Sequence, residues 1–151
     1  MANTKIKVKD CLITKESPVI TIGPDETVLK AIQKLVSHNI GALPVCDAKG
    51  MLQGIVSERD LLKACAENSR NIGNIKVKDV MTKDVIICTL EEDINSVTGI
   101  LLEKGIRHMP VLDGNDIVGI ISMRDIVDIQ LEDSEETVRF LNEYIAGMPI
   151  S

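Results

Sequence analysis

The pattern of apolar and polar positions predicts short strands that alternate with amphipathic helices. After the β-branched run "VITI" at 19–22, the stretch "PDETVLKAIQKLVSHNI" opens with Pro24 and an acidic turn, which is typical of a helix start. Val28, Ile32 and Leu35 share one face of that helix. The segments "ALPVC" and "MLQGIVS" flank the turn "DAKG", which predicts a β-hairpin. A second helix, "ERDLLKACAE", follows.

The same order of elements returns in the second half of the chain. We expect a strand at 85–88, a helix at 92–104, strands at 108–112 and 117–121 around a turn at 113–116, and a helix at 123–131. The letters repeat as well: "IKVKD" occurs twice, "NIGALPVCD" matches "GIRHMPVLD", and "GIVSERD" matches "GIISMRD". An ordered repeat of this kind indicates two homologous units.

Each unit is therefore a β-α-β-β-α motif, and the fold class is α+β. One such unit is too small for a well-buried core, so two units that pack together with approximate two-fold symmetry are expected. We assign 1–71 to the first motif with its N-terminal segment and linker, 72–131 to the second motif, and 132–151 to a C-terminal helical tail. Asp133 and Glu136 form a capping-box pattern that predicts a new helix start in this tail.

Two apolar rows run along the predicted tail helix. One holds Val138, Leu141 and Ile145, and the other holds Phe140, Tyr144 and Met148. The tail either packs on its own body or contributes to a dimer contact, because aromatic side chains are enriched at interfaces.

Composition and charge exclude several classes of protein. Hydrophobic residues make up 44% and charged residues 26% of 151 residues, as in a folded globular chain. No apolar run is long enough for a bilayer, and the first ten residues lack an apolar signal core, so we expect a cytoplasmic protein with no membrane contact. The net charge of −6 disfavours nucleic-acid binding. The four cysteines are scattered without a C-x-x-C pair, so no metal site is expected.

The repeated heptads, Gly54–Asp60 and Gly119–Asp125, carry the candidate chemistry. Ser57 with Asp60, and Ser122 with Asp125, match a helix capping box, which explains both residues without a ligand. The alternative is a nucleotide site, because a helix N-terminus attracts phosphate and a carboxylate accepts hydrogen bonds from a ribose diol. The glycines indicate a close approach in either case.

Basic residues distinguish the two motifs. Arg107 and His108 precede the hairpin strand of the second motif, where the first motif has Gly41 and Ala42. A guanidinium suits phosphate, but His108 is equally compatible with a packing role. Arg59 and Arg124 precede the two aspartates and are either ligand contacts or solvated helix residues.

In the order of its motifs, residues 6 to about 131 resemble a pair of CBS domains, a Bateman module. The resemblance rests on the two β-α-β-β-α units, the "LPV" and "MPV" strands and the two G-h-x-S-x-x-D heptads. It implies adenosine-containing ligands (AMP, ADP, ATP or S-adenosylmethionine) in two clefts between the motifs. By position, the first cleft would hold Ser57, Arg59, Asp60, Val85, Ile86, Ile106, Arg107 and His108. The second would hold Val19, Ile20, Ile40, Gly41, Ala42, Ser122, Arg124 and Asp125.

The resemblance also implies a regulatory module of the stand-alone type that forms a homodimer and signals to an unknown effector protein. The first rival is a structural module that acts in assembly without a ligand. The second is an enzyme, which the absence of a nucleophile–base pair or metal cluster in the sequence disfavours.

Overall fold

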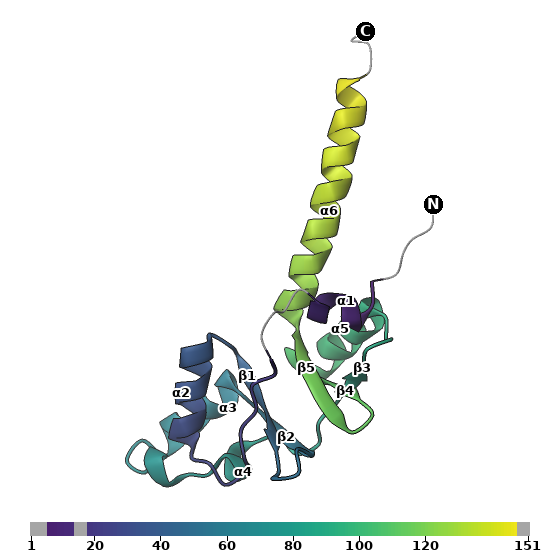
Figure 1. The fold of residues 1–151 in the computed structure, drawn as a ribbon. Coiled ribbons are helices and arrows are strands. Elements are labelled where there is room, and N and C mark those ends of the chain that lie inside the picture. The colour runs from purple at the N-terminus through teal and green to yellow at the C-terminus, as the bar shows by residue number, and fades with distance from the viewer. Residues whose placement is uncertain (1–5, 14–17, 148–151) are drawn as a thin grey trace.

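Two similar lobes lie side by side, and one long helix rises from the second lobe (Figure 1). The computed structural model describes residues 6–13 and 18–147. The first lobe contains α2 (Val28–His38), β1 (Ala42–Cys46), β2 (Leu52–Ser57) and α3 (Glu58–Glu67). The second contains β3 (Cys88–Thr89), α5 (Ile94–Lys104), β4 (His108–Asp113), β5 (Asp116–Ser122) and α6 (Met123–Ala146). Three short helices complete the chain: α1 (Val8–Ile13), η1 (Ile72–Asn74) and α4 (Val77–Val80).

The two hairpins have the same register, which confirms the predicted internal repeat and the α+β class. β1 and β2 pair antiparallel from Ala42 opposite Ser57, and β4 and β5 pair antiparallel from His108 opposite Ser122. The early strands are shorter than predicted. In the second lobe only Cys88 and Thr89 pair with β4, and in the first lobe Ile22 forms a single parallel bridge to Val45.

The segment that precedes each motif packs on the other lobe. Val8 and Cys11 of α1 are buried in the core of the second lobe, together with Ile94, Leu101 and Met109. Conversely, Val77 of α4 is buried in the core of the first lobe. The two copies of "IKVKD" therefore exchange places, and each lobe completes its core with residues that precede the other motif.

Backbone hydrogen bonds hold both exchanged segments in equivalent positions. Val8 N–H donates to the carbonyl of Glu92 at 2.9 Å, and Val77 N–H donates to the carbonyl of Glu26 at 2.8 Å. Ile94 N–H donates to Ile6 and Val28 N–H donates to Ile75 in the same way. The segments are thus fixed at the start of α5 and α2 by the main chain.

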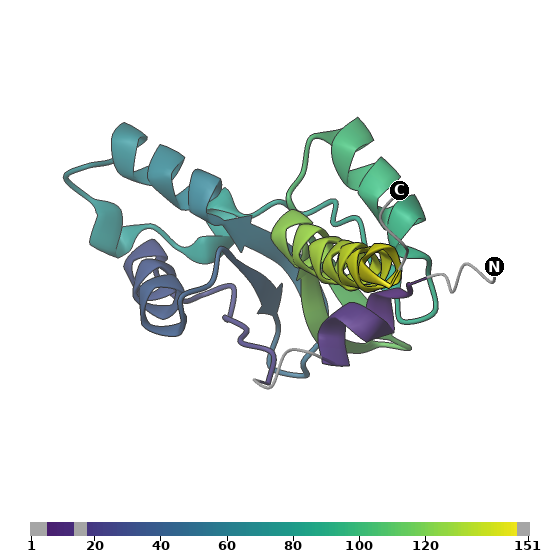
Figure 2. The same cartoon turned by 90° about the horizontal axis from the view of Figure 1, so that it is seen from above.

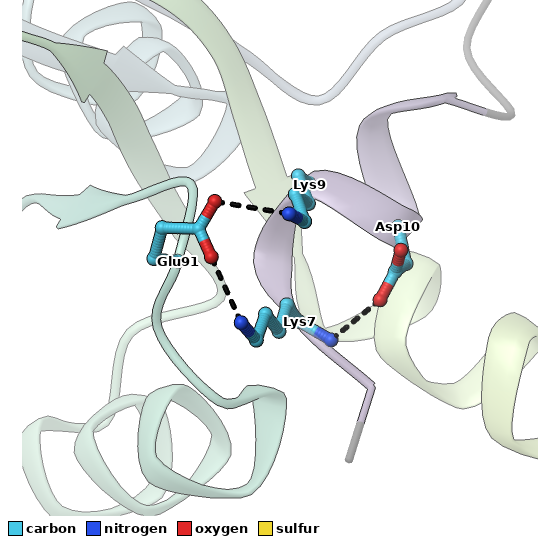
Figure 3. A network of polar contacts seen from close by, with 4 residues as sticks. All are labelled: Lys7, Lys9, Asp10 and Glu91. Atoms are coloured by element: carbon cyan, nitrogen blue, oxygen red, sulfur yellow. Dashed lines mark hydrogen bonds and ion pairs between the residues drawn. The ribbon is translucent and has the colours of Figure 1, made fainter. Parts of the chain in front are cut away.

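Exposed ion pairs repeat the same symmetry at the surface. Glu91 accepts from Lys7 Nζ at 2.8 Å and from Lys9 Nζ at 3.0 Å (Figure 3), and these hydrogen bonds hold the pKa of Glu91 below its usual value. Asp25 occupies the matching place beside Lys76 and Lys78. Such exposed pairs contribute little to stability. The buried apolar residues and the main-chain hydrogen bonds therefore hold the exchanged segments on the lobes.

The heptad glycines predict that another part of the chain lies close to them, and the exchanged segments are that part. A Cβ added to Gly119 would lie 2.8 Å from Cδ2 of Leu12, which follows the first "IKVKD". A Cβ added to Gly54 would lie 2.7 Å from both Sδ of Met81 and the carbonyl oxygen of Thr82. Packing of the exchanged segments on the lobes therefore accounts for both glycines.

Two predicted helix starts are wrong. The first helix begins at Val28 rather than at Pro24, because the Thr27 side chain accepts the Lys30 N–H and caps the helix there. Asp133 and Glu136 do not start a new helix, since α6 runs without a break from Met123 to Ala146. The apolar positions of α6 continue at helical spacing past the end of the repeat. The helix therefore continues as well, and the capping pattern at Asp133 does not interrupt it. Met148 lies outside the described residues.

We predict that alanine is worse tolerated at Gly54 than at Gly119. At Gly54 the added methyl meets a backbone oxygen, whereas at Gly119 it meets the end of a flexible side chain. Overpacking of this kind costs about 1–3 kcal/mol, and chemical denaturation should place Gly54→Ala at the upper end.

The matched control is Leu12→Ala, which removes the atoms that face Gly119. The double variant Leu12→Ala, Gly119→Ala should be less destabilised than the sum of the two single variants. Strict additivity would show that Leu12 does not pack against Gly119 in solution.

We predict that thiol alkylation in the native protein begins at Cys65. Cys11, Cys46 and Cys88 are buried, whereas Cys65 is half-buried. Burial also raises the pKa of Cys88 to about 12, so very little of its reactive thiolate exists near pH 8. Mass spectrometry after brief iodoacetamide treatment should find Cys65 modified and Cys88 unmodified until the chain unfolds. Early modification of Cys88 would contradict the buried core.

Candidate functional site

A cleft of about 810 Å³ lies between the two lobes. The extended segment around Ile20, the end of α2 and the start of β1 form its first wall. The strand β5 and the start of α6 form the opposite wall. The volume lies within the usual range for sites that hold a small molecule.

The residues predicted for the second cleft all line this one cleft. They come from separate parts of the chain and from both motifs: Val19, Ile20, Ile40, Gly41, Ala42, Ser122, Arg124 and Asp125. Their convergence follows from the pseudo-symmetry, which sets the start of β1 opposite the end of β5. Their role in ligand binding remains a prediction.

Ser122 and Asp125 adopt the capping-box geometry at the start of α6. Ser122 N–H donates to Asp125 Oδ2 at 2.8 Å, and Asp125 N–H donates to Ser122 Oγ at 3.1 Å. Ser57 and Asp60 repeat this arrangement at the start of α3, where Ser57 N–H donates to Asp60 Oδ2 at 2.9 Å. A carboxylate has about four acceptor positions, so capping by itself does not exclude hydrogen bonds to ligand hydroxyls.

Arg107 and His108 line the same cleft as Asp125, although the sequence grouped them with Ser57 and Asp60. The His108 ring reaches the start of β1, where a Cβ on Gly41 would lie 2.9 Å from Nε2. Glu58 Oε1 would lie 3.4 Å from the same Cβ. Residues of both predicted sets therefore meet near Gly41, at the junction of the two lobes.

Charges of both signs line the cleft. The guanidinium groups of Arg107 and Arg124 accompany the carboxylates of Glu58, Asp125 and Asp128. The cleft therefore offers donors to a phosphate or carboxylate and acceptors to hydroxyl or amino groups. Apolar side chains of the first wall, among them Ile20 and Ile40, offer a surface for a ring.

Apart from Arg107 and His108, the residues predicted for the first cleft hold the repeat-equivalent positions of the two motifs. Ser57 and Asp60 start α3, and Arg59 is exposed on that helix. Val85 and Ile86 are half-buried in the extended segment before β3, where Ile86 packs against the core of the second lobe. Ile106 packs against that core too. Thr82 exchanges two backbone hydrogen bonds with Ile55 of β2, at 2.8 and 3.0 Å, beside this segment.

Sequence reasoning missed several lining residues that carry chemistry. Glu58 stands at a variable-looking position of the first heptad, and Asp128 lies one turn beyond Asp125 on α6. His38 and Asn39 end α2, where Asn39 adopts a left-handed conformation with φ 52°. Helical periodicity could have predicted Asp128, which lies one turn after Asp125. Glu58 reaches the cleft only because the two lobes are in contact.

The described residues show neither a metal cluster nor a membrane-spanning helix. In 6–13 and 18–147, no group of three or more His, Cys, Asp or Glu side chains is arranged to hold a metal ion. Within the same ranges, no helix is long and apolar enough to cross a membrane.

The sequence profile of the CBS domain matches the chain twice, at residues 8–67 and 77–132. The chain therefore belongs to the CBS domain family and contains a pair of these motifs. This finding confirms the resemblance that the repeated heptads indicated.

Relatives and solved structures agree with this assignment. A 17.7 kDa protein of Acidianus ambivalens is 34% identical over 127 residues, which cover 83% of this chain and 74% of the relative. The CBS-domain protein ATU1752 of Agrobacterium tumefaciens has a TM-score of 0.78 at 37% identity, with 83% of this chain and 99% of that chain covered. The matched part spans only 58% of a Methanopyrus kandleri relative that is 34% identical and covers 74% of this chain.

A similar solved structure contains adenosine-derived ligands. The CBS domain pair of protein MJ0100, in complex with 5′-methylthioadenosine and S-adenosyl-L-methionine, has a TM-score of 0.77 at 30% identity. The comparison covers 85% of this chain and 98% of that chain. Ligand binding by a pair of CBS motifs of this fold is thus established for that protein.

We predict that the capping role of Asp125 can be measured from protein stability alone. Asp125→Ala removes the acceptor for Ser122 N–H and should lower the free energy of unfolding by about 1 kcal/mol. Asp125→Asn keeps one acceptor oxygen and should cost less. Denaturant titration measures both, and equal stability of wild type and Asp125→Ala would contradict the capping role.

Proposed function

We propose that this protein is a regulatory module that binds an adenosine-containing ligand in the cleft between its CBS motifs. The observation that carries the proposal is the convergence of Ser122 and Asp125 with Ile20, Ile40 and Gly41 around one cleft of about 810 Å³. The adenosyl ligands bound by the CBS pair of MJ0100 support the same ligand class.

The arrangement of the cleft fits the parts of such a ligand. Asp125 accepts hydrogen bonds from the two ribose hydroxyls, as a carboxylate at a helix start is able to do while it caps the helix. Ile20 and Ile40 supply an apolar surface for the base. Arg107 and Arg124 offer forked donors to a phosphate or a carboxylate at the other end of the ligand.

Regulation follows from the position of the cleft between lobes. A ligand that contacts both walls binds best to one arrangement of the lobes, and it shifts the population by that difference in affinity. In this proposal the module is a cytoplasmic homodimer without catalytic activity, and a separate effector protein recognises the ligand-bound arrangement.

A second candidate is a module that acts in assembly without a ligand. Specific contacts favour it: Leu12 and Met81 account for the heptad glycines, and capping accounts for Ser122 and Asp125. The same residues serve the fold whether or not a ligand is bound, so only a binding measurement separates the two functions.

We predict micromolar binding of at least one adenosyl ligand to stripped, nucleotide-free protein. Isothermal titration with AMP, ADP, ATP, S-adenosylmethionine and 5′-methylthioadenosine tests both anionic and cationic members of the class. Asp125→Asn should weaken binding at least tenfold, about 1.4 kcal/mol, because it removes acceptor capacity while keeping the cap.

The matched control is Asp60→Asn, the equivalent change at the start of α3. Loss of binding in Asp125→Asn alone places the ligand in the cleft described above, and loss in both variants indicates two occupied clefts. No heat with any of these ligands, from protein shown to be folded, would contradict the proposed function and favour the assembly role.

A further inference from the structure

The helix α6 leaves the body of the molecule after two turns. Ile126 is fully buried and Ile129 packs against the core of the second lobe. Beyond Gln130, the side chains that the structure describes are exposed. Seen from above, nearly along its axis, α6 stands over the second lobe beside α1 (Figure 2).

An apolar stripe follows the exposed part of this helix with alternating spacings of four and three residues. We call it the α6 stripe: Val127, Leu131, Ser134, Val138 and Leu141. Its four apolar side chains are 44%, 54%, 54% and 50% exposed. Spacing of this kind is the heptad repeat of two helices that pack along a common seam, and by sequence the repeat continues at Ile145.

The charged residues of the projecting helix avoid the α6 stripe. Most of its carboxylates, including Glu132, Asp133, Glu136 and Glu143, occupy heptad positions away from the seam. A shallow groove along the helix is lined by Leu131, Ser134 and Val138 of the stripe, together with the charged residues Glu135, Arg139 and Glu143. The helix is therefore amphipathic, although no part of its own chain that the structure describes covers its apolar side.

The length of the projecting helix favours a partner. Residues 131–146 extend roughly 24 Å at 1.5 Å per residue, and helices of about this length are marginal in water on their own. The packed first two turns of α6 hold only one end of this segment, so packing of its apolar side would add to its stability.

We propose that the α6 stripe pairs with the α6 stripe of a second copy of this chain, as a parallel, in-register two-helix seam. A second copy supplies an identical heptad repeat, which is the surface that fits the stripe. The inference deepens the homodimer of the proposed function and names its contact, but it does not depend on the ligand.

Charge selects the parallel orientation. In a parallel pair, Glu135 beside the seam faces the neutral Gln130 of the second copy. An antiparallel pair sets Glu135 near Glu135 of the second copy, and like charges at such positions are destabilising. The excess of carboxylates on α6 also means that salt should strengthen self-association, because it screens their repulsion.

The first test compares two neighbouring substitutions by sedimentation equilibrium of the full chain. Val138→Asp lies in the α6 stripe, whereas Arg139→Asn lies outside the seam and changes the net charge by the same amount. We expect wild type and Arg139→Asn to be dimeric, and Val138→Asp to weaken the dimer at least tenfold. A monomeric wild type, or a dimer that Val138→Asp leaves unchanged, overturns the inference. The second outcome leaves the homodimer and the proposed function in place.

A cross-linking test does not depend on destabilising the helix. In a Cys65→Ser background the remaining cysteines are buried, so Ser134→Cys supplies the reactive thiol. In the parallel seam this residue meets its own copy at a distance that a disulfide spans, and mild oxidation should give a covalent dimer. Arg139→Cys is the control and should remain monomeric on denaturing gels.

An antiparallel dimer and a different partner protein would each give a different result in these tests. An antiparallel seam brings Ser134 near Val138 of the second copy, so only a mixture of Ser134→Cys and Val138→Cys proteins would cross-link. A basic partner protein would leave the purified chain monomeric and would bind more weakly as salt rises. Either result overturns the proposal.

Discussion

The reciprocal docking of the two "IKVKD" segments is the constraint on which the rest of the structure depends. Each segment leaves its own motif and completes the core of the other, through Val8 and Cys11 in one direction and Val77 in the other. Matching backbone bonds to Glu92 and Glu26 fix both segments. Because neither core is complete alone, the lobes are held in a defined arrangement, and a cleft between them has a defined shape. The glycines of the heptads belong to this constraint, since Leu12 and Met81 pack where a Cβ would otherwise lie.

Much of the fold could be predicted from the sequence, because both repeats contain the same pattern of elements. The two hairpins and α3 appear where the alternation and the capping signals predict them. The exchange of the leading segments is invisible to such reasoning, since burial of Val8 against α5 depends on contacts between distant parts of the chain. The continuous α6 was missed for a related reason. The pattern at Asp133 and Glu136 resembles a helix start, but a capping side chain acts only where the preceding backbone leaves its N–H groups without partners.

The candidate site, too, could be predicted from the sequence only in part. The family resemblance, carried over by position in the repeat, named eight of the residues that line the cleft. It assigned Arg107 and His108 to the first cleft, whereas both line this one, because both motifs contribute residues near the pseudo-symmetry axis. Glu58, which approaches His108 and Gly41 there, has no signal in the sequence. The capping geometry of Ser122 and Asp125 has a second consequence. The residues that would contact a ribose are already ordered before a ligand arrives, which lowers the entropic cost of binding.

A crystal structure with bound ligand is the decisive experiment. The protein should be crystallised with the adenosyl compound that binds most tightly, and the structure determined with the cleft saturated. We expect density for the ligand between the two lobes, with its ribose hydroxyls within hydrogen-bond distance of Asp125 and its base against Ile20 and Ile40. An empty cleft at saturating ligand, or a ligand bound elsewhere on the molecule, would contradict this expectation.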